Sequence, residues 1–255
     1  MEKQAIIKIS DLKKNYKQGK DETQVLKEVN VTIYRNDFTI IMGNSGSGKS
    51  TFLYCVSGMD SISSGSVSFL NYEIADLKED SLSTLRKQHM GFVFQQMNLM
   101  PNLNIIENIT IPAYLLSKKK KTEIIENAKE LMNNFNIKGL EKRFPSQVSG
   151  GQLQRVAIAR ALINQPEIIF ADEPTGALNS TSGKEVLDTL TSCNDTGQSI
   201  LMVTHDVKAA LRANRIIYIS DGQIKGEKLL LPFVEEKNLK ERENTVLSWL
   251  FEMGW

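Results

Sequence analysis

The sequence has few of the features that mark secreted, membrane-spanning or nucleic-acid-binding proteins. Its two cysteines, Cys55 and Cys193, lie in segments with a helical pattern and lack metal-like spacing, so we expect reduced thiols in a cytosolic protein. No apolar signal core follows the first residues, and no apolar run approaches the roughly 20 residues that a transmembrane helix needs. A formal net charge of only +1 gives no electrostatic reason to expect nucleic acid or a membrane surface as a partner. A role at a membrane would therefore require docking on another protein.

Internal repeats and low-complexity linkers are also missing. A chain of 255 residues allows one large α/β domain, or a domain with a subdomain. Short apolar runs bounded by polar residues predict buried strands, and they lie at residues 39–42, 91–94, 168–171 and 200–203.

The strongest motif lies between the apolar run at residues 39–42 and a helical pattern at residues 51–56. It matches the phosphate-loop pattern G-x-x-x-x-G-K-[ST] without mismatch and reads Gly43, Asn44, Ser45, Gly46, Ser47, Gly48, Lys49, Ser50 and Thr51. Glycines let successive backbone N–H groups point at phosphate oxygens, and the helix N-terminus adds donors and a positive dipole end. Lys49 then reaches the β- and γ-phosphates, and Ser50 holds Mg²⁺. A turn that merely starts a helix would not explain the Lys-Ser pair after the last glycine.

Polar side chains follow the other apolar runs directly. Gln95 is placed to hold Mg²⁺ or orient water, although polar residues commonly end strands. Asp172 and Glu173 lie where α/β sheets bind ligands, so Asp172 suits Mg²⁺ through water and Glu173 suits a general base on an attacking water. His205 is one of two histidines, and its place at the same sheet edge favours a functional role. His89, in a link between a helix and a strand, is interpreted as structural.

Between about residues 97 and 160 the pattern becomes helical, with helices expected at residues 108–116, 118–135 and 152–163. The run Lys118–Lys121 would suit nucleic acid, but the neutral overall charge and the apolar helical spacing behind it favour a solvated helix start. A second anion-ready helix start presents a serine hydroxyl and backbone donors, and it reads Val148, Ser149, Gly150, Gly151 and Gln152.

The amino-terminal part predicts two strands, at residues 5–12 and 25–34, joined by a polar loop at residues 13–23. Tyr16 falls in this loop. An aromatic residue ahead of a phosphate loop stacks on a nucleotide base or packs on its own hairpin, and the local pattern alone favours neither.

Taken in this order, the motifs resemble those of the ATP-binding subunit of ABC transporters, over roughly residues 5–228. The specific element is Ser149–Gln152, because P-loop proteins at large lack it. The resemblance implies an α/β fold, namely a P-loop NTPase ABC ATPase core with an N-terminal antiparallel β subdomain and an inserted α-helical subdomain. The expected ATP-binding domain covers residues 1–230, with the helical subdomain at about residues 97–160, and a tail follows at residues 231–255.

The resemblance also implies a role for each site residue, with ATP and Mg²⁺ as cofactors. Tyr16 is the aromatic residue that stacks on adenine. Ser50, Gln95 and Asp172 hold Mg²⁺, Glu173 is the catalytic base, and His205 is the switch histidine. Gln95 also links the metal to the transporter contact.

The same resemblance implies a homodimer. Ser149, Gly150, Gly151 and Gln152 contact the γ-phosphate of ATP held by the other subunit, so two chains associate head to tail when ATP binds. Val148 replaces the usual leucine of the signature, and Asn179 replaces the usual aspartate of the D-loop at residues 177–179. The second departure leaves the coupling across the dimer open.

Three sequence segments resemble those of the MacB/LolD-type branch of the family, namely Gln95–Leu99, Ala171–Leu178 and Val203–Asp206. Within that branch, Gly176–Asn179 and Asp206–Ala210 are most similar to bacitracin- and lantibiotic-resistance ATPases. This likeness implies an ATPase that powers export, extraction or resistance to antimicrobial peptides through a separate, FtsX-like membrane permease. The permease would hold the chain at the cytoplasmic face of the membrane, and no nucleic acid is expected.

Three alternatives remain. Within the same branch, the chain would serve lipoprotein release, or macrolide-type export and mechanotransmission. A soluble ABC-type ATPase of DNA repair or translation usually has two ATPase domains or long coiled-coil insertions, and neither is seen in this sequence. A P-loop kinase or GTPase would lack the helix start at Ser149–Gln152.

Two further segments lead to hypotheses. Met97, Leu99 and Met100 are apolar in an expected loop, so we predict that a short permease helix docks there; the alternative is that they close the subdomain's own core. Beyond Pro232, an amphipathic helix is predicted that packs on protein, with Leu239, Val246, Leu250 and Met253 on one face and Trp249 beside them.

Overall fold

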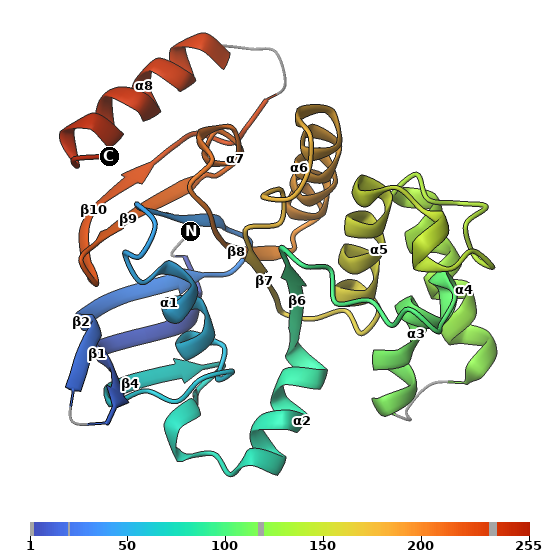
Figure 1. Cartoon of the computed structure of the whole chain (residues 1–255), viewed down its shortest axis with the longest axis horizontal. Helices are drawn as coiled ribbons and strands as arrows, with labels where there is room; N and C mark the ends of the chain where they lie inside the picture. The colour runs from blue at the N-terminus through green and yellow to red at the C-terminus, as the bar shows by residue number, and fades with distance from the viewer. Residues whose placement is uncertain (1–2, 20, 117–119, 235–238) are drawn as a thin grey trace. The chain divides into compact units, whose positions relative to one another are not determined.

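The computed structural model describes residues 3–19, 21–116, 120–234 and 239–255. The chain forms two compact units, Met1–Leu82 with Ser199–Trp255, and Ser83–Gln198. Each unit is described by itself below, with the element labels of Figure 1.

The first unit contains an antiparallel sheet with the strand order β2-β1-β4-β5. Its strands are β1 (Ala5–Gln18), β2 (Asp21–Tyr34), β4 (Ser64–Phe69) and β5 (Tyr72–Glu73). The prediction of a loop at residues 13–23 is wrong. β1 extends to Gln18 and β2 begins at Asp21, so the two strands form a long hairpin in which Tyr16 pairs with Thr23. Register shifts between Ile9 and Asn15 disturb the alternation of apolar and polar residues in the inner part of the hairpin. The outer part pairs residues 15–18 with residues 21–24, and these residues are almost all polar, so they carry no strand pattern.

A second sheet region in the same unit has central strands that are buried on both faces and an edge strand, β10 (Gln223–Leu229), that is not. β3 (Phe38–Met42) pairs in parallel with β8 (Ser199–Val203) and with β9 (Arg215–Ser220), and β10 is antiparallel to β9. Every residue of β3 and β8 is buried, as expected for continuous apolar runs in parallel strands. Helix α1 (Lys49–Val56) follows β3 and contacts β8, and the short α7 (Val207–Ala210) follows β8. The unit also contains the 3₁₀ turn η1 (Ile74–Asp76).

Helix α8 (Leu239–Glu252) lies along β10 in Figure 1. Val246 and Leu250 are fully buried, and Trp249 is nearly so. Gly226 of β10 makes this close approach possible, since a Cβ there would lie 2.5 Å from the Sδ atom of Met253. Leu239, which the sequence places on the packed face, is instead exposed at the first residue of the helix. Residues 235–238 of the predicted tail lie outside the described residues.

One arginine attaches α8 to the segment behind α7. The Nε of Arg242 donates to the carbonyl of Leu211 at 2.7 Å, and its Nη1 donates to that of Leu231 at 2.7 Å. The Nη2 donates to the carbonyl of Ala213. Three backbone acceptors therefore fix the first turns of α8.

The second unit contains one parallel strand pair and most of the helices. β6 (Met90–Phe94) and β7 (Ile168–Asp172) pair in parallel, and the rings of Phe92 and Phe170 stack between them at 5.5 Å. The helices are α3 (Ile105–Leu116), α4 (Lys121–Asn134), α5 (Gly150–Leu162) and α6 (Ser180–Asp195), with the 3₁₀ turn η2 (Pro145–Gln147) before α5. α5 contacts α3, α4, α6 and β6, which makes it the centre of this unit. α2 (Glu79–His89) precedes β6. In the predicted lysine run, Lys118 and Lys119 lie outside the described residues.

Both cysteines are buried, Cys55 in α1 and Cys193 in α6. Burial raises the pKa of each thiol to about 12. Within the described ranges, no helix is both long enough and apolar enough to cross a membrane.

Candidate functional site

The phosphate loop joins the end of β3 to the start of α1, and close backbone packing explains its glycines. A Cβ on Gly43 would lie 2.1 Å from the carbonyl oxygen of Ile219 in β9, so only glycine fits there. Gly48 is the residue before α1 and has φ 100°, in the left-handed region that favours glycine. The loop is therefore held tightly against its own sheet.

The start of α1 has no side-chain cap. The Nζ atom of Lys49 donates to the carbonyls of Gly43 at 2.8 Å and Asn44 at 2.9 Å, which places the ammonium inside the loop. The hydroxyl of Ser47 is buried and has no hydrogen-bond partner within the described part of the chain. A buried ammonium, an uncapped helix start and an unpaired hydroxyl converge on one loop, and this donor set fits the phosphates of a nucleotide.

Tyr16 lies beside this loop. Its hydroxyl donates to Oδ2 of Asp60 at 2.6 Å, just beyond α1. Burial and the bond to Asp60 raise the pKa of Tyr16 to about 12, although a hydrogen bond with Thr51 of α1 lowers it. Tyr16 is therefore a protonated donor at neutral pH, anchored to the helix that carries the phosphate loop.

His205 leaves the sheet at the same edge as the loop. Ile41 of β3 and Val203 of β8 are partners in the parallel ladder, and the N–H of Thr204 donates to the carbonyl of Ile41 at 3.1 Å. His205 follows Thr204 and is exposed. The first unit thus brings together the phosphate loop, Tyr16 and His205.

The second unit places Gln95 and Glu173 at neighbouring strand ends. Phe94 of β6 pairs with Asp172 of β7, so the residues that follow them leave the sheet side by side. The turn after β7 returns toward Gln95, since a Cβ on Gly176 would lie 2.9 Å from its Nε2 atom. Gln95, Asp172 and Glu173 therefore form one polar cluster.

Glu173 has a strained backbone, with φ 45°. A residue with a side chain in the left-handed region costs about 1–2 kcal/mol. The carbonyl of Glu173 accepts from the N–H of Gly176 at 3.0 Å, and this tight turn holds the conformation. Strain of this kind, kept at the end of a buried strand, points to a functional residue.

The Ser149 segment begins α5 with a capping box. Both donors of Ser149, its N–H and its hydroxyl, lie 3.1 Å from Oε1 of Gln152, and the N–H of Gln152 returns a bond to the Ser149 hydroxyl oxygen at 3.4 Å. Gly151 lies against the start of α6, because a Cβ on it would be 2.7 Å from the Cβ of Ser182. Glycine here serves the close approach of two helices.

Asp172 is the one carboxylate among Ser50, Gln95 and Asp172, the residues that the sequence predicts to hold Mg²⁺. Mg²⁺ is commonly held by one or two carboxylates together with phosphate oxygens of the substrate, so this residue set suits a nucleotide-bound ion. In the described ranges, no group of three or more His, Cys, Asp or Glu side chains could hold a metal ion by itself. Ser50 belongs to one unit, and Gln95 and Asp172 belong to the other.

Sequence reasoning missed Lys14 and Asp60. Lys14 is buried in β1 and donates to Oδ1 of Asp60 at 2.7 Å. The only signal in the sequence was the position of Lys14 two residues before Tyr16, which puts the two side chains on one face of the strand. The position of Asp60 gave no signal.

A sequence model of the ABC transporter family matches residues 26–176. The chain is 46% identical over 219 residues to the macrolide export ATP-binding/permease protein MacB of Mannheimia succiniciproducens, covering 86% of this chain and 34% of that protein. It is 37% identical over 248 residues to MacB of Escherichia coli, covering 96% and 38% respectively. It is also 41% identical over 221 residues to the probable syringafactin export protein SyfD of Pseudomonas syringae, covering 87% and 33%. The chain thus spans about a third of the length of these relatives.

Among solved structures, the chain is similar to the ATP-binding cassette MJ0796 in a dimeric post-hydrolysis state bound to ADP and phosphate. The TM-score is 0.82 at 39% identity, and the match covers 89% of this chain and 100% of that one. A second dimeric structure of MJ0796 gives the same TM-score at 40% identity.

Proposed function

Because this chain belongs to the ABC transporter family, we propose that it hydrolyses ATP to power a membrane permease that exports its substrate. It is an ABC ATPase cassette that uses ATP and Mg²⁺, since it matches such cassettes over their full length. The observation that carries the proposal is the phosphate loop, which combines the buried Lys49 ammonium, a Ser47 hydroxyl with no partner among the described residues, and a helix start without a side-chain cap.

Each part of the two units then has a task in the reaction. Lys49 and the loop N–H groups bind the phosphates, and Ser50, Gln95 and Asp172 hold Mg²⁺, which neutralises phosphate charge. Glu173 orients the attacking water and accepts its proton. His205, at the sheet edge beside the loop, stabilises the γ-phosphate end of the site.

The dimeric structures of MJ0796 support the proposal that two copies of this chain pair head to tail around ATP. In that arrangement Ser149–Gln152 contact the γ-phosphate held by the other copy. ATP shifts the equilibrium toward the closed dimer only by its differential affinity for that state, and hydrolysis then releases it.

The branch and the cargo are finer proposals. The names of the relatives, macrolide and syringafactin export proteins that carry a permease, favour an export function of the MacB type. The phrases at Gly176–Asn179 and Asp206–Ala210 favour resistance to antimicrobial peptides, through an FtsX-like permease at the cytoplasmic face of the membrane. Purification of the membrane protein that binds this chain, followed by peptide and macrolide sensitivity of cells lacking the chain, separates the two.

The loop at residues 95–101 is the proposed docking point for the permease. Arg160 of α5 fixes the loop backbone by donating to the carbonyls of Met97 at 2.8 Å and Asn98 at 2.7 Å. Met100 is 57% exposed on this fixed backbone, whereas Met97 and Leu99 are half-buried. We expect Met100→Glu to reduce co-purification of the permease without changing ATP binding or thermal unfolding. Unchanged co-purification would refute docking at this loop.

The substitution Glu173→Gln tests the proposed chemistry. It should retain ATP binding and lower steady-state turnover by about 10²–10⁴-fold, because general-base catalysis contributes that much. Glu130→Gln, at an exposed position of α4, is the matched control and should leave turnover unchanged. Turnover by Glu173→Gln close to that of the unmodified chain would reject Glu173 as the base.

A further inference from the structure

Three side chains form a hydrogen-bonded network beside the phosphate loop. Asp60 accepts from both others, from Lys14 Nζ at Oδ1 (2.7 Å) and from the Tyr16 hydroxyl at Oδ2 (2.6 Å). The Lys14 ammonium also lies over the Tyr16 ring, 4.7 Å from its centroid. The network therefore closes on itself, with each member touching the other two.

The ammonium of Lys14 is held in this position by burial and by several hydrogen bonds. The side chain is almost fully buried, and a buried charge is tolerated only when its hydrogen bonds are satisfied. Besides Asp60, the Nζ atom donates to the backbone carbonyl of Ser61 at 2.6 Å. Burial tends to raise the pKa of Asp60, but the hydrogen bonds from Lys14 and Tyr16 outweigh it and hold the pKa below its ordinary value. The carboxylate stays charged at neutral pH.

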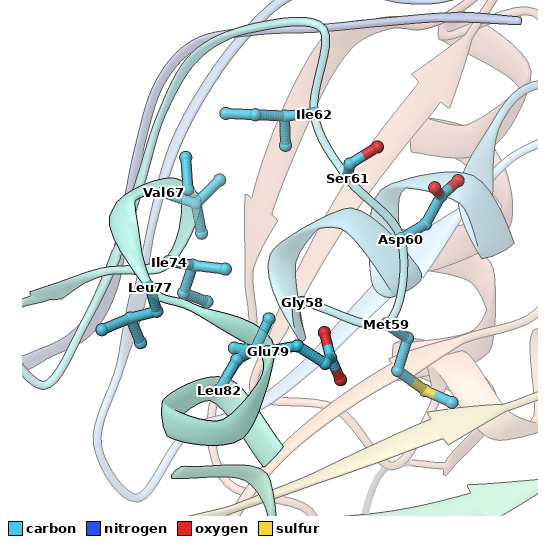
Figure 2. A pocket seen from close by; sticks show the side chains of 11 residues that line it. Gly58, Met59, Asp60, Ser61, Ile62, Val67, Ile74, Leu77, Glu79 and Leu82 are labelled. Carbon is cyan, nitrogen blue, oxygen red and sulfur yellow. The ribbon is translucent and has the colours of Figure 1, made fainter. Parts of the chain in front are cut away.

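Helix α1 connects this network to the phosphate loop. The loop runs into the first residue of α1, and Asp60 follows its last turn, where the N–H of Asp60 donates to the carbonyl of Tyr54 at 3.1 Å. Asp60 and Ser61 also line a cavity of about 290 Å³, and Figure 2 shows the Asp60 carboxylate turned away from the apolar side chains of Val67 and Ile74. The backbone bond to Tyr54 thus ties Asp60 to the end of α1, and its carboxylate accepts from Tyr16.

Tyr16 keeps an exposed ring despite these contacts. Its hydroxyl is anchored, its ring carries the ammonium on one side, and 43% of the residue remains accessible. We propose that Lys14 and Asp60 are positioning residues that hold the Tyr16 ring ready to stack on the base of ATP, so that the ring lies between the ammonium and the base. This inference rests on the proposed function, because it assumes ATP in the phosphate loop.

Two physical effects favour this arrangement. A ring already fixed in place does not lose side-chain freedom when the base arrives, so stacking becomes more favourable. A cation on the opposite face of an aromatic ring is attracted by its π-system, and it remains in contact when a base covers the accessible side. Neither effect acts on the phosphates, which bind to the loop.

The test compares ATP with inorganic tripolyphosphate, which has the phosphates but no base. Both are titrated with Mg²⁺ into the full chain by calorimetry. We expect Lys14→Met to weaken ATP binding by about 2–10-fold, the value of a pre-ordered side chain, and to leave tripolyphosphate binding unchanged. Lys13→Met is the matched control, since its ammonium pairs with Glu28 at 2.8 Å, away from Tyr16, and it should change neither affinity.

Two variants at Tyr16 complete the experiment. Tyr16→Ala should weaken ATP alone, by about 5–150-fold, and in that background Lys14→Met should have no further effect on ATP. Tyr16→Phe keeps the ring and loses the hydroxyl that bonds to Asp60 and Thr51, at an exposed residue that tolerates the change. It should weaken ATP by about 2–5-fold and so gives a second reading if Lys14→Met unfolds the chain.

The outcomes separate three ideas. Equal losses for ATP and tripolyphosphate in Lys14→Met and in Tyr16→Phe would assign the network a structural role only and overturn the inference. A Lys14→Met effect that persists in the Tyr16→Ala background would also overturn it. No ATP binding by the unmodified chain would reject the proposed function, and the inference with it. If the unmodified chain binds ATP, and Lys14→Met shows the same difference between ATP and tripolyphosphate affinity, only the inference is rejected.

Discussion

Helices α1 and α5 both begin in a segment of glycine and serine, but a side chain caps the first N–H groups only at α5. α1 follows Gly48, which offers no side chain, and its neighbour Ser47 has a buried hydroxyl without a partner among the described residues. α5 follows Ser149, whose side chain accepts from the N–H of Gln152 while Gln152 accepts from Ser149. The start of α1 has no capping side chain that a ligand would have to displace, whereas the start of α5 is capped by a side chain of the same segment.

This difference shows that a glycine- and serine-rich helix start in the sequence does not by itself mean that the helix is uncapped in the structure. A phosphate can enter the α1 loop without breaking any side-chain cap. At α5 a phosphate would bond the Ser149 hydroxyl only in exchange for its bond to Gln152, and under the proposed function that phosphate belongs to ATP on another copy of the chain. Such a contact suits a site that responds to assembly, whereas the α1 loop suits one that binds first.

The largest effect is expected from Lys49→Ala, which removes the charge from the open start. A hydrogen bond to a charged group contributes about 1.5–3 kcal/mol, so ATP affinity should fall by about 10–150-fold. Equilibrium titration with ATP measures the loss, and Lys208→Ala at an exposed position of α7 is the control. An affinity within twofold of the unmodified chain would show that the loop does not bind through this ammonium.

Gly151→Ala tests the packing of the closed start. A Cβ there would lie 2.7 Å from the Cβ of Ser182, so the two helix starts must separate, at a cost of about 1–3 kcal/mol in the free energy of unfolding. Urea denaturation measures this loss, and Ser182→Gly in the same chain should recover part of it. Gly46→Ala is the comparison at the open start, where no atom lies within 4 Å but φ is +79°. A Gly151→Ala chain as stable as its parent would contradict the close approach.

Ser149→Ala removes the cap of α5 and should lower the free energy of unfolding by about 1 kcal/mol. Ser149→Asn keeps an acceptor at the cap position and should retain most of the stability. Urea denaturation without nucleotide gives both values. If alanine and asparagine behave alike, the capping box does not stabilise α5.

Ser47→Ala is expected to have the smallest effect, and unlike Gly151→Ala and Ser149→Ala it should not lower the stability of the nucleotide-free protein. Its hydroxyl is buried without a partner in the described chain, so its loss should leave the nucleotide-free protein equally stable or slightly more stable. The stabilisation by ATP should decrease, because a phosphate loses one hydrogen-bonding group. Thermal unfolding with and without ATP reports both quantities, and a lower midpoint without nucleotide would show that Ser47 already has a partner.

The sequence predicts the parts of the site that follow from apolar runs. Four buried runs correspond to β3, β6, β7 and β8, and the residues directly behind them include Gln95, Glu173 and His205. Their place at strand ends could be predicted because a buried run ends where a polar residue enters. Their chemical roles stay predictions, since side-chain geometry alone assigns no reaction.

The parts that could not be predicted depend on long-range contacts. Lys14 and Asp60 are 46 residues apart, and no periodic pattern connects them. The outer half of the β1–β2 hairpin escaped notice because its residues are almost all polar, so only the pairing of two distant segments shows it to be strand. The strained φ of Glu173 is imposed by the turn to Gly176 and by neither residue alone.

The two buried cysteines have a practical consequence. At pH 8 a thiol with a pKa of about 12 is ionised in on the order of one molecule in 10⁴, and only the thiolate reacts with maleimides or disulfides. The two native thiols should therefore react little with labelling reagents when a reactive cysteine is introduced elsewhere. A single Met100→Cys chain would carry one reactive thiol on an accessible loop, and a fluorophore attached there would test the docking proposed for this loop without removal of either native thiol.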